Sequence, residues 1–475
     1  MERKNAWKEY SDEQVSELEK LSDEYIDFIS NNKTEREFTA AARKMAEDKG
    51  YRPLSEAIAE GKRLVAGDKV WASTHGKAIM LVQLGKRPMT EGLNILGAHI
   101  DSPRLDLKQN PLYESTDFAL LDTHYYGGIK KYQWVTLPLA IHGVVAKTDG
   151  EVVKVVVGED PDDPVFCVTD LLPHLGSEQM QKKASQVIDG EALDVLVGGR
   201  PFVIDEDEEL PDDAPKWKKT AKKNPVMGNI LRILAEKYDI DEEDFLSAEL
   251  EVVPAGRARD LGFDRSMVMG YGQDDKVCAY TSLVAQLAIE NPEKTTVTIL
   301  VDKEEIGSVG ATGMTSLFFE NTIAEIMELA GFGGTLQLHR ALAASKMLSS
   351  DVSAGVDPSY KSVFEDKNAA FLGRGLVFNK YTGARGKSGS NDASAEYVAE
   401  VRKVMDDAGV KFQTAELGKV DAGGGGTIAY IPAKYDMDVI DSGVSVLSMH
   451  APWEVTSKAD IYEARRGYEA FLLNA

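Results

Sequence analysis

The chain has 475 residues, of which 43% are hydrophobic and 28% charged, and a net charge of −24 at pH 7. This length predicts two domains, and the negative charge argues against nucleic acid or an anionic membrane as a partner, because both require a basic surface. The two cysteines, Cys167 and Cys278, form no C-x-x-C motif. Without a signal-peptide core or a run of ~18 apolar residues, a cytoplasmic globular protein is expected.

The first hundred residues predict two helices and three strands. Thr34 and Glu37 form a T-x-x-E capping box at the start of the second helix, and Gly50 follows its end. His75-Gly76 is suited to a tight turn between two strands. The predicted elements are a helix at 13–30, the helix capped by Thr34, and strands at 70–74, 77–84 and 93–98.

The composition changes between residues 105 and 252, where β-rich runs dominate. Thr148-Asp149-Gly150 is typical of a hairpin turn. The predicted elements are strands 134–147, 151–158, 201–204 and 248–253, a helix 227–238, and an acidic exposed loop 205–215. We interpret 105–252 as a mainly β domain inserted into an α/β catalytic domain formed by 1–104 and 253–475.

Strands and helices alternate after Pro254, which predicts a mixed, mostly parallel sheet flanked by helices. The predicted elements are helices 276–289, 314–329, 336–346, 394–408 and 457–473, and strands 296–301 and 444–449. The buried strand 296–301 runs directly into Asp302, Glu304 and Glu305. Adjacent carboxylates at the tip of a buried strand are costly unless a metal or a proton neutralises them, so this pair is a functional candidate.

Polar side chains also stand at the ends of other predicted elements, where ligands of open α/β sheets bind. The set comprises His99, Asp101, Asp274, Asp275, Glu304, Glu305, Asp351 and His450. Histidine and carboxylate ligands without thiolates suit zinc or another first-row divalent ion. Their number exceeds one tetrahedral site and fits two metals that share a carboxylate bridge. Asp101, two residues after His99, is suited to orient that imidazole.

Each of these short motifs has an ordinary structural interpretation when it stands alone. H-x-D is common by chance, Asp-Asp before a helix is often an N-terminal cap, and Glu-Glu is usually a solvated face. His450 alone could be a buried histidine with a hydrogen-bond partner. Their joint occurrence at successive element ends favours one shared site.

The order and local context of these residues resemble the aspartyl aminopeptidase and aminopeptidase I family of dinuclear zinc peptidases. The matching segments are GAHIDSPRLDLK (97–108), GYGQDDKV (270–277), VDKEEIGSVGATG (301–313), SSDVSAGVDPSY (349–360), SGSNDAS (388–394), GGGGTIAYI (423–431) and LSMHAPWEV (447–455). They cover nearly the whole chain. The resemblance therefore implies the family's fold and its aminopeptidase activity on peptides with a free N-terminus.

The resemblance also implies individual roles. One metal would be bound by His99, Asp274 and Asp351, and the other by Asp274, Glu305 and His450. Glu304 would be the general base and Asp101 would orient His99. Asp274, rather than Asp275, is the implied bridge. The implied cofactor is two divalent ions, with Zn²⁺ favoured and Co²⁺ or Mn²⁺ as alternatives, and the implied assembly is homodimers, formed through the inserted domain, that build a homododecamer.

Some features stay open at this point. Pro173-His174-Leu175 lacks the second histidine that often follows it in the family, which leaves the role of His174 undecided. The segment 380–387 carries Lys380, Arg385 and Lys387, which either bind an acidic substrate side chain or belong to a solvated loop. The preference for an acidic or a neutral N-terminal residue is therefore undecided.

Some of the same residues are compatible with other functions. Gly383 to Ser388 ends like a phosphate-binding loop, but Tyr381 stands where the first glycine would be needed. A dinuclear carboxypeptidase or amide deacylase would use a similar scaffold on a different substrate end. A non-catalytic self-assembling protein is the remaining alternative, and Glu304 argues against it because a structural metal site needs no adjacent base.

Overall fold

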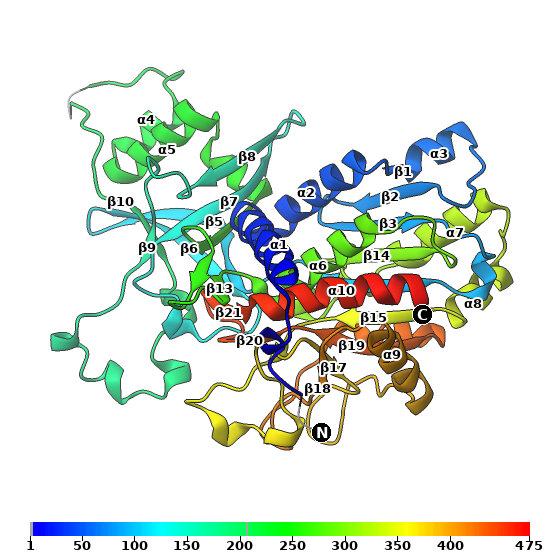
Figure 1. Ribbon diagram of the computed structural model, residues 1–475. Coiled ribbons are helices and arrows are strands. Elements are labelled where there is room, and N and C mark those ends of the chain that lie inside the picture. The colour runs from blue at the N-terminus through cyan, green and yellow to red at the C-terminus, as the bar shows by residue number, and fades with distance from the viewer. Residues whose placement is uncertain (1–2, 206–207) are drawn as a thin grey trace. The chain divides into compact units, whose positions relative to one another are not determined.

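The computed structural model describes residues 3–205 and 208–475 (Figure 1). Its chain divides into two units. Unit 1 comprises the chain up to Ser102 together with Ala258–Met449 and Trp453–Ala475, and unit 2 comprises Pro103–Arg257 and His450–Pro452. Within the described ranges, no helix is both long and apolar enough to cross a membrane.

Unit 1 is built around a nine-stranded mixed sheet. In spatial order its strands are β1 (Arg52–Pro53), β2 (Lys69–Thr74), β3 (Ala78–Gln83), β14 (Thr296–Val301), β4 (Asn94–His99), β15 (Lys346–Ser350), β19 (Asp438–Gly443), β17 (Leu376–Asn379) and β18 (Phe412–Thr414). The central run from β14 through β4 and β15 to β19 is parallel, whereas β3 pairs antiparallel with β2 and β14, and β17 pairs antiparallel with β19. The predicted mixed, mostly parallel α/β sheet is confirmed.

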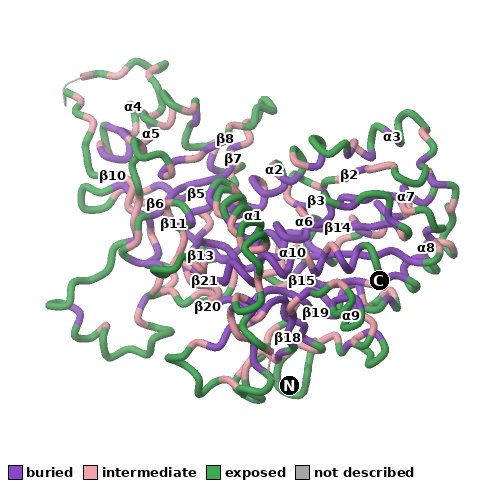
Figure 2. Tube along the Cα trace, viewed as in Figure 1, coloured by how far each residue is buried: buried purple, intermediate pink, exposed green. Residues whose placement is uncertain are grey.

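Helices cover both faces of this sheet, and β14 shows why. Val297, Ile299 and Val301 pack into one core with α3 (Leu54–Glu60), α7 (Phe318–Ala330) and α8 (Thr335–Ala343). Leu300 packs into the other core, with α1 (Asp12–Asn31), α2 (Glu35–Asp48), α6 (Gln273–Ala288), α9 (Ala395–Asp407) and α10 (Lys458–Asn474). Side chains alternate across a strand, and all six residues of β14 are buried, so this strand is covered on both faces. Figure 2 shows β14 and β15 buried accordingly.

A smaller sheet completes unit 1. Its order is β12 (Arg259–Leu261), β13 (Met267–Gly270), β21 (Glu454–Ser457), β20 (Ser445–Leu447) and β16 (Ser353–Ala354). Gly270 on β13 pairs with Glu454 on β21. Because α6 begins three residues after Gly270, this sheet holds the start of that helix.

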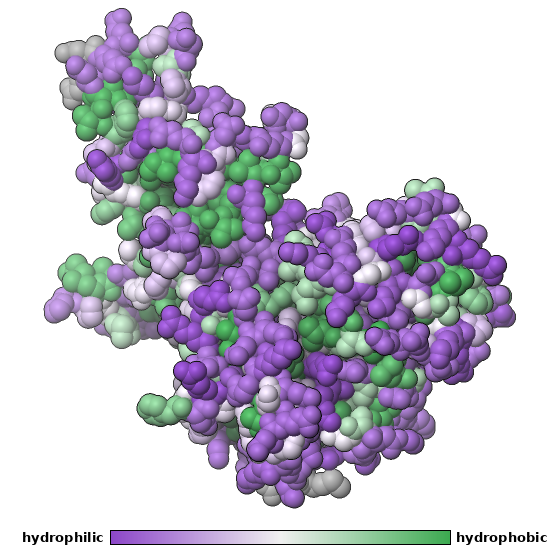
Figure 3. Space-filling model, turned by 45° about the horizontal axis from the view of Figure 1, so that its top comes forward, coloured by the Kyte–Doolittle hydropathy of each residue, from purple (hydrophilic) through white to green (hydrophobic). Residues whose placement is uncertain are grey.

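Unit 2 contains a seven-stranded sheet, ordered β8 (Val152–Val157), β7 (Leu139–Ala146), β11 (Ala248–Pro254), β5 (Arg104–Ser115), β6 (Phe118–Tyr126), β10 (Val195–Gly198) and β9 (Cys167–Val168), with helices α4 (Lys216–Ala221) and α5 (Pro225–Tyr238). Glu114 accepts backbone hydrogen bonds from Val226 (3.0 Å) and Met227 (2.9 Å), so a strand residue caps α5. The visible surface of the molecule is mainly hydrophilic and carries several apolar patches (Figure 3).

Several predicted elements need correction. The expected strand 201–204 is wrong: Pro201 has no N–H to donate, and Phe202 donates to the carbonyl of Pro225 instead of to a strand. The strand expected at 134–147 begins only at Leu139, and the helix expected at 314–329 begins at Phe318. The helix expected at 336–346 ends at Ala343, and Lys346 instead opens β15. The strand expected at 444–449 is shortened to Ser445–Leu447.

The long hairpin of β5 and β6 was missed. Its turn consists of Thr116 and Asp117, which adopt positive φ angles of 49° and 62° without a glycine. A turn of this kind lacks the glycine signal on which hairpin prediction depends. The acidic loop expected at 205–215 is irregular where it is described, and residues 206–207 of that segment lie outside the described residues.

The capping box of α2 generates a stability prediction. The Thr34 hydroxyl accepts from the Glu37 N–H (3.2 Å), and the Glu37 carboxylate accepts from the N–H of Thr34 (3.2 Å). Thr34→Ala should lower the free energy of unfolding by about 1 kcal/mol, because a helix-terminal N–H loses its partner. Urea denaturation checks this. Thr34→Ser, which keeps the hydroxyl, should be close to wild type, and an unaltered midpoint in the alanine variant would contradict the assignment.

Candidate metal centre

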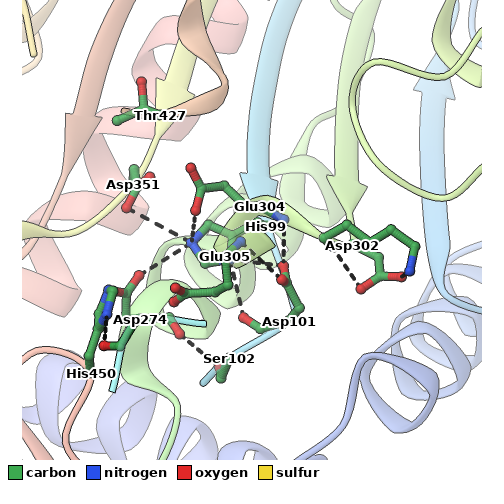
Figure 4. A network of polar contacts seen from close by, with 12 residues as sticks. His99, Asp101, Ser102, Asp274, Asp302, Glu304, Glu305, Asp351, Thr427 and His450 are labelled. Carbon is green, nitrogen blue, oxygen red and sulfur yellow. Dashed lines mark hydrogen bonds and ion pairs between the residues drawn. The ribbon is translucent and has the colours of Figure 1, made fainter. Parts of the chain in front are cut away.

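The parallel pairing of three central strands brings their carboxyl ends together. His99 is the last residue of β4, Asp351 follows β15, and Glu304 and Glu305 lie on a short 3₁₀ turn, Glu304–Ile306, just after β14. Val301 on β14 is paired with His99 on β4. Residues from three segments far apart in the sequence therefore meet at one sheet edge, as Figure 4 shows.

His99 lies at the centre of this group. Its Nε2 is 3.2 Å from Asp274 Oδ1, 3.9 Å from Asp351 Oδ1 and 4.0 Å from Glu304 Oε2 (Figure 4). The opposite ring nitrogen, Nδ1, is 3.2 Å from Asp101 Oδ1 and 3.1 Å from the Asp101 carbonyl oxygen. A proton on Nδ1 satisfies both acceptors and leaves the Nε2 lone pair directed at the carboxylates, which is the tautomer that a metal ligand needs.

Asp101 also holds the turn that carries the two glutamates. Its Oδ1 accepts from the N–H of Glu304 at 3.1 Å, and its Oδ2 accepts from the N–H of Glu305 at 3.2 Å. The Asp101 side chain is fully buried. One carboxylate therefore fixes the imidazole of His99 and the backbone of both glutamates relative to each other.

One group of candidate ligands lies entirely within unit 1. Donor atoms of His99, Asp274 and Asp351 lie within 4.8 Å of one another. His450 belongs to the short segment of the chain that is counted with unit 2, where its Nδ1 lies 2.8 Å from the carbonyl oxygen of Gly128. Its role as a ligand therefore stays a prediction from the sequence.

The carboxylates crowd one another electrostatically. Burial raises the pKa of Asp351 well above its usual range; nearby Asp274 and Glu304 raise it further, while His99 opposes them. For His99, burial by itself lowers the pKa, but hydrogen bonds to Asp101 and Asp274 outweigh burial and raise it. An accumulation of buried negative charge of this kind is relieved by a bound cation.

The donor set fits zinc. An imidazole nitrogen and carboxylate oxygens are ordinary zinc ligands, and the Asp101–His99 contact is the carboxylate–histidine arrangement that commonly supports such a ligand. The residues that would hold metal come from α6 and from the ends of β4, β14 and β15, which are buried regular elements. Rigid elements of this kind hold ligands at fixed separations, as a metal site requires.

Two further side chains at the site had no predicted role. Asp302 accepts from the Thr312 hydroxyl at 2.6 Å and its N–H donates to the Thr312 carbonyl, which closes the loop that contains Glu304 and Glu305. Asp441, on β19, accepts from the hydroxyl of Thr427 at 2.6 Å. Asp302 could have been found from the sequence, because it is an acidic residue directly after a buried strand. Nothing in the sequence around Asp441 marks it as a residue of the site.

Other candidates lie elsewhere in unit 1. Asp275 is fully buried next to Cys278, and its pKa is raised well above the usual range, chiefly by burial. Lys380 and Lys387 both form ion pairs with Asp392, at 2.8 Å and 2.9 Å. Two of the three cations in the segment 380–387 therefore have a carboxylate partner within unit 1.

In unit 2, His174 lies on an exposed 3₁₀ turn, Pro173–Leu175.

Comparison with known proteins gives the family. Residues 28–472 match the family model described as aminopeptidase I zinc metalloprotease (M18). The chain belongs to the M18 family of zinc aminopeptidases. It is 61% identical over 473 residues to the probable M18 family aminopeptidase 1 of Clostridium acetobutylicum, with 100% of this chain and 98% of that protein covered. The predicted resemblance is confirmed.

Solved structures agree with the fold. The crystal structure of the M18-family aminopeptidase from Thermotoga maritima superposes with a TM-score of 0.91 at 44% identity and full coverage of both chains. A dodecamer of mApe1 from Saccharomyces cerevisiae has a TM-score of 0.73 at 19% identity, covers 96% of this chain and 97% of its own, and shows the shared fold alone. The chain is therefore a metal-dependent aminopeptidase that hydrolyses peptides and uses zinc. This excludes the phosphate-binding and non-catalytic alternatives.

Asp441 generates a prediction about pH. Burial, with the Glu304 charge adding to it and the Thr427 hydrogen bond opposing it, raises the pKa of Asp441 from 3.8 to about 7. A pKa raised by folding adds stability at low pH, and that stability disappears as the pH rises through the folded-state value. Between pH ~4 and ~7, wild type should therefore lose up to about 1.4 kcal/mol per pH unit relative to Asp441→Asn, whose side chain stays neutral.

Urea denaturation of both proteins at several pH values measures this difference. Asp438→Asn, at the exposed start of the same strand, is the matched control for replacing an aspartate by an asparagine on β19. Parallel pH profiles of wild type and Asp441→Asn would contradict the prediction.

Proposed function

We propose that this M18 aminopeptidase is dinuclear and that Glu304 is its general base. The observation that carries the proposal is the group of His99, Asp274 and Asp351, whose donor atoms lie within 4.8 Å of one another, with a Glu304 carboxylate oxygen 4.0 Å from His99 Nε2. One metal is assigned to His99, Asp274 and Asp351. The other is assigned to Asp274, Glu305 and His450, which completes the set of five ligands.

The two glutamates have different tasks in this proposal. Glu305 stays ionised as a ligand. Glu304 accepts a proton from the attacking water at a carboxylate oxygen and later donates it to the nitrogen of the leaving peptide. Asp101 holds both residues through their N–H groups and keeps the His99 tautomer fixed. When bound, two divalent ions acidify a water molecule, polarise the scissile carbonyl and offer a position for the free α-amino group of the substrate.

The substrate class follows from the amine contact. The free α-amino group of a substrate can bind a cation only in its neutral form. An enzyme that requires this contact cleaves next to the N-terminus of a peptide and is therefore an exopeptidase. The segment from Gly423 to Thr427 is glycine-rich, so a peptide backbone can approach it closely. Its Thr427 hydroxyl donates a hydrogen bond to Asp441. The preference for an acidic N-terminal residue is left to a panel of aminoacyl substrates assayed with zinc, cobalt and manganese.

The Glu304 assignment is tested by Glu304→Gln. This variant should lower kcat by ~10²-fold or more, because the amide cannot accept the proton, while both metals stay bound. Glu305→Gln is the matched comparison, since it alters the adjacent residue and should instead lower the metal content. Turnover of aminoacyl substrates and elemental analysis of metal measure the two effects.

Unaltered kcat in Glu304→Gln would overturn the base assignment. Chelation of the wild-type enzyme gives the reference state: activity should disappear and return on addition of zinc. Turnover that persists after complete removal of metal would overturn the mechanism as a whole.

We further propose that the inserted region 105–252 mediates homodimer formation and that the dimers assemble into a dodecamer. The support is the family membership and the dodecamer named for the yeast relative. Multi-angle light scattering should give a mass close to twelve times 51.9 kDa. A monomer mass would contradict the assembly without affecting the proposed chemistry.

A cytoplasmic location is likewise proposed. Cys167 and Cys278 are both free thiols, as expected for a protein of a reducing compartment.

A further inference from the structure

The backbone of Asp274 is fixed by contacts from outside its own helix. Asp274 is the second residue of α6, but its φ and ψ angles of −80° and 109° are not helical. The helix begins after Gly272, which has no side chain to cap it. N–H groups in a first helical turn have no partner within the helix. The position of the Asp274 carboxylate therefore depends on whatever binds its N–H and its carbonyl.

Glu454 binds the N–H. Its Oε2 accepts from Asp274 N at 3.0 Å, across a sequence separation of 180 residues. Glu454 is only 1% exposed, and its own carbonyl accepts from the Gln273 side chain at 2.7 Å. Because Glu454 opens β21 and is paired with Gly270 on β13, the small sheet determines where this carboxylate stands. A negative charge at the start of a sixteen-residue helix is also favourable.

Ser102 binds the carbonyl, and Lys276 binds Ser102. The Ser102 hydroxyl donates to the Asp274 carbonyl oxygen at 2.8 Å and accepts from Lys276 Nζ at 2.5 Å. An ammonium group has only donors, so the Lys276 contact directs the serine proton toward Asp274. Lys276 is 1% exposed, and a lysine buried to this extent is uncommon unless it is paired.

These contacts converge on Asp274, the residue that the proposed function assigns to both metals. A helix start can be satisfied by a single local serine, threonine or aspartate. Here Glu454 and Ser102, from two distant segments, and Lys276, from α6 itself, are buried to do so, at the desolvation cost of charged groups. Partners of metal ligands typically alter metal affinity by 10–100-fold when they are removed.

We propose that Glu454 and the Ser102–Lys276 pair are positioning residues that hold the Asp274 carboxylate where two metal ions can share it. This inference rests on the proposed two-metal function. It assigns to Glu454 a role through the Asp274 N–H, and to Ser102 and Lys276 a role through the Asp274 carbonyl. None of the three is itself assigned as a ligand.

The test is metal affinity, measured by titration of the metal-free protein with zinc against a chromophoric chelator. Glu454→Leu, which removes the acceptor, should weaken zinc binding at both sites by about 10–100-fold. Ser102→Ala should weaken it in the same direction. Glu454→Gln, which keeps an oxygen acceptor, should restore most of the affinity. The visible spectrum of the cobalt-substituted protein should change in Glu454→Leu and Ser102→Ala, because the ligand geometry changes.

Glu463→Leu is the matched control. Glu463 is also fully buried in unit 1, within α10, and accepts a backbone hydrogen bond from Lys411 N at 2.9 Å. Its loss should lower the melting temperature while zinc affinity stays at the wild-type value. If Glu454→Leu weakens zinc binding no more than Glu463→Leu does, the inference is overturned.

Two outcomes separate this inference from the proposed function. Wild-type protein that binds a single zinc ion would overturn the two-metal function and this inference with it. Wild-type protein that binds two ions, together with unaltered affinity in Ser102→Ala, would overturn the positioning role alone. Should Glu454→Leu fail to fold, the comparison of Ser102→Ala with wild type decides the matter by the same titration.

Discussion

The buried carboxylate of Asp101 is the contact on which the rest of the site depends. It binds the imidazole of His99, at the end of β4, and the N–H groups of Glu304 and Glu305, after β14. Two neighbouring parallel strands are thereby locked in register at their polar ends. Without this contact, the N–H groups of Glu304 and Glu305 would lose their acceptor, and the turn would no longer be tied to the end of β4.

The fold places this charge where it can be used. Helices cover both faces of the nine-stranded sheet, so its central strands β14, β4 and β15 are largely buried, and the candidate ligands stand at their ends. The carboxylates at that edge are crowded and partly desolvated, which raises the pKa of Asp351 well above its usual range. A cation is the natural complement of such a site, and membership of the M18 zinc aminopeptidases agrees with it.

The strands β2, β3, β4 and β14 of the nine-stranded sheet and most of the candidate ligands could be predicted, because both leave strong local signals, whereas β1, β15, β17, β18 and β19 were not predicted as strands. The strand Thr296–Val301 was predicted to the residue, since an unbroken apolar run ends abruptly in charge. The errors lie where the chain gives no such signal: the turn at Thr116 and Asp117 has no glycine, and Phe202 satisfies its N–H at Pro225 instead of in a strand. Lys346 was expected to end a helix but opens β15. Its pairing partners, Asn94 and Asp438, are distant in sequence and leave no signal near Lys346.

The sequence by itself determined the fold class, the family and the residue types of the site, since apolar periodicity and short motifs are local properties. Only the tertiary structure decided how these residues are held. The second task of Asp101, the closure of the Glu304 loop by Asp302 and Thr312, and the contacts of Glu454 and Ser102 with Asp274 all join distant segments. Such contacts depend on which strands become neighbours, and a single sequence carries no local record of that.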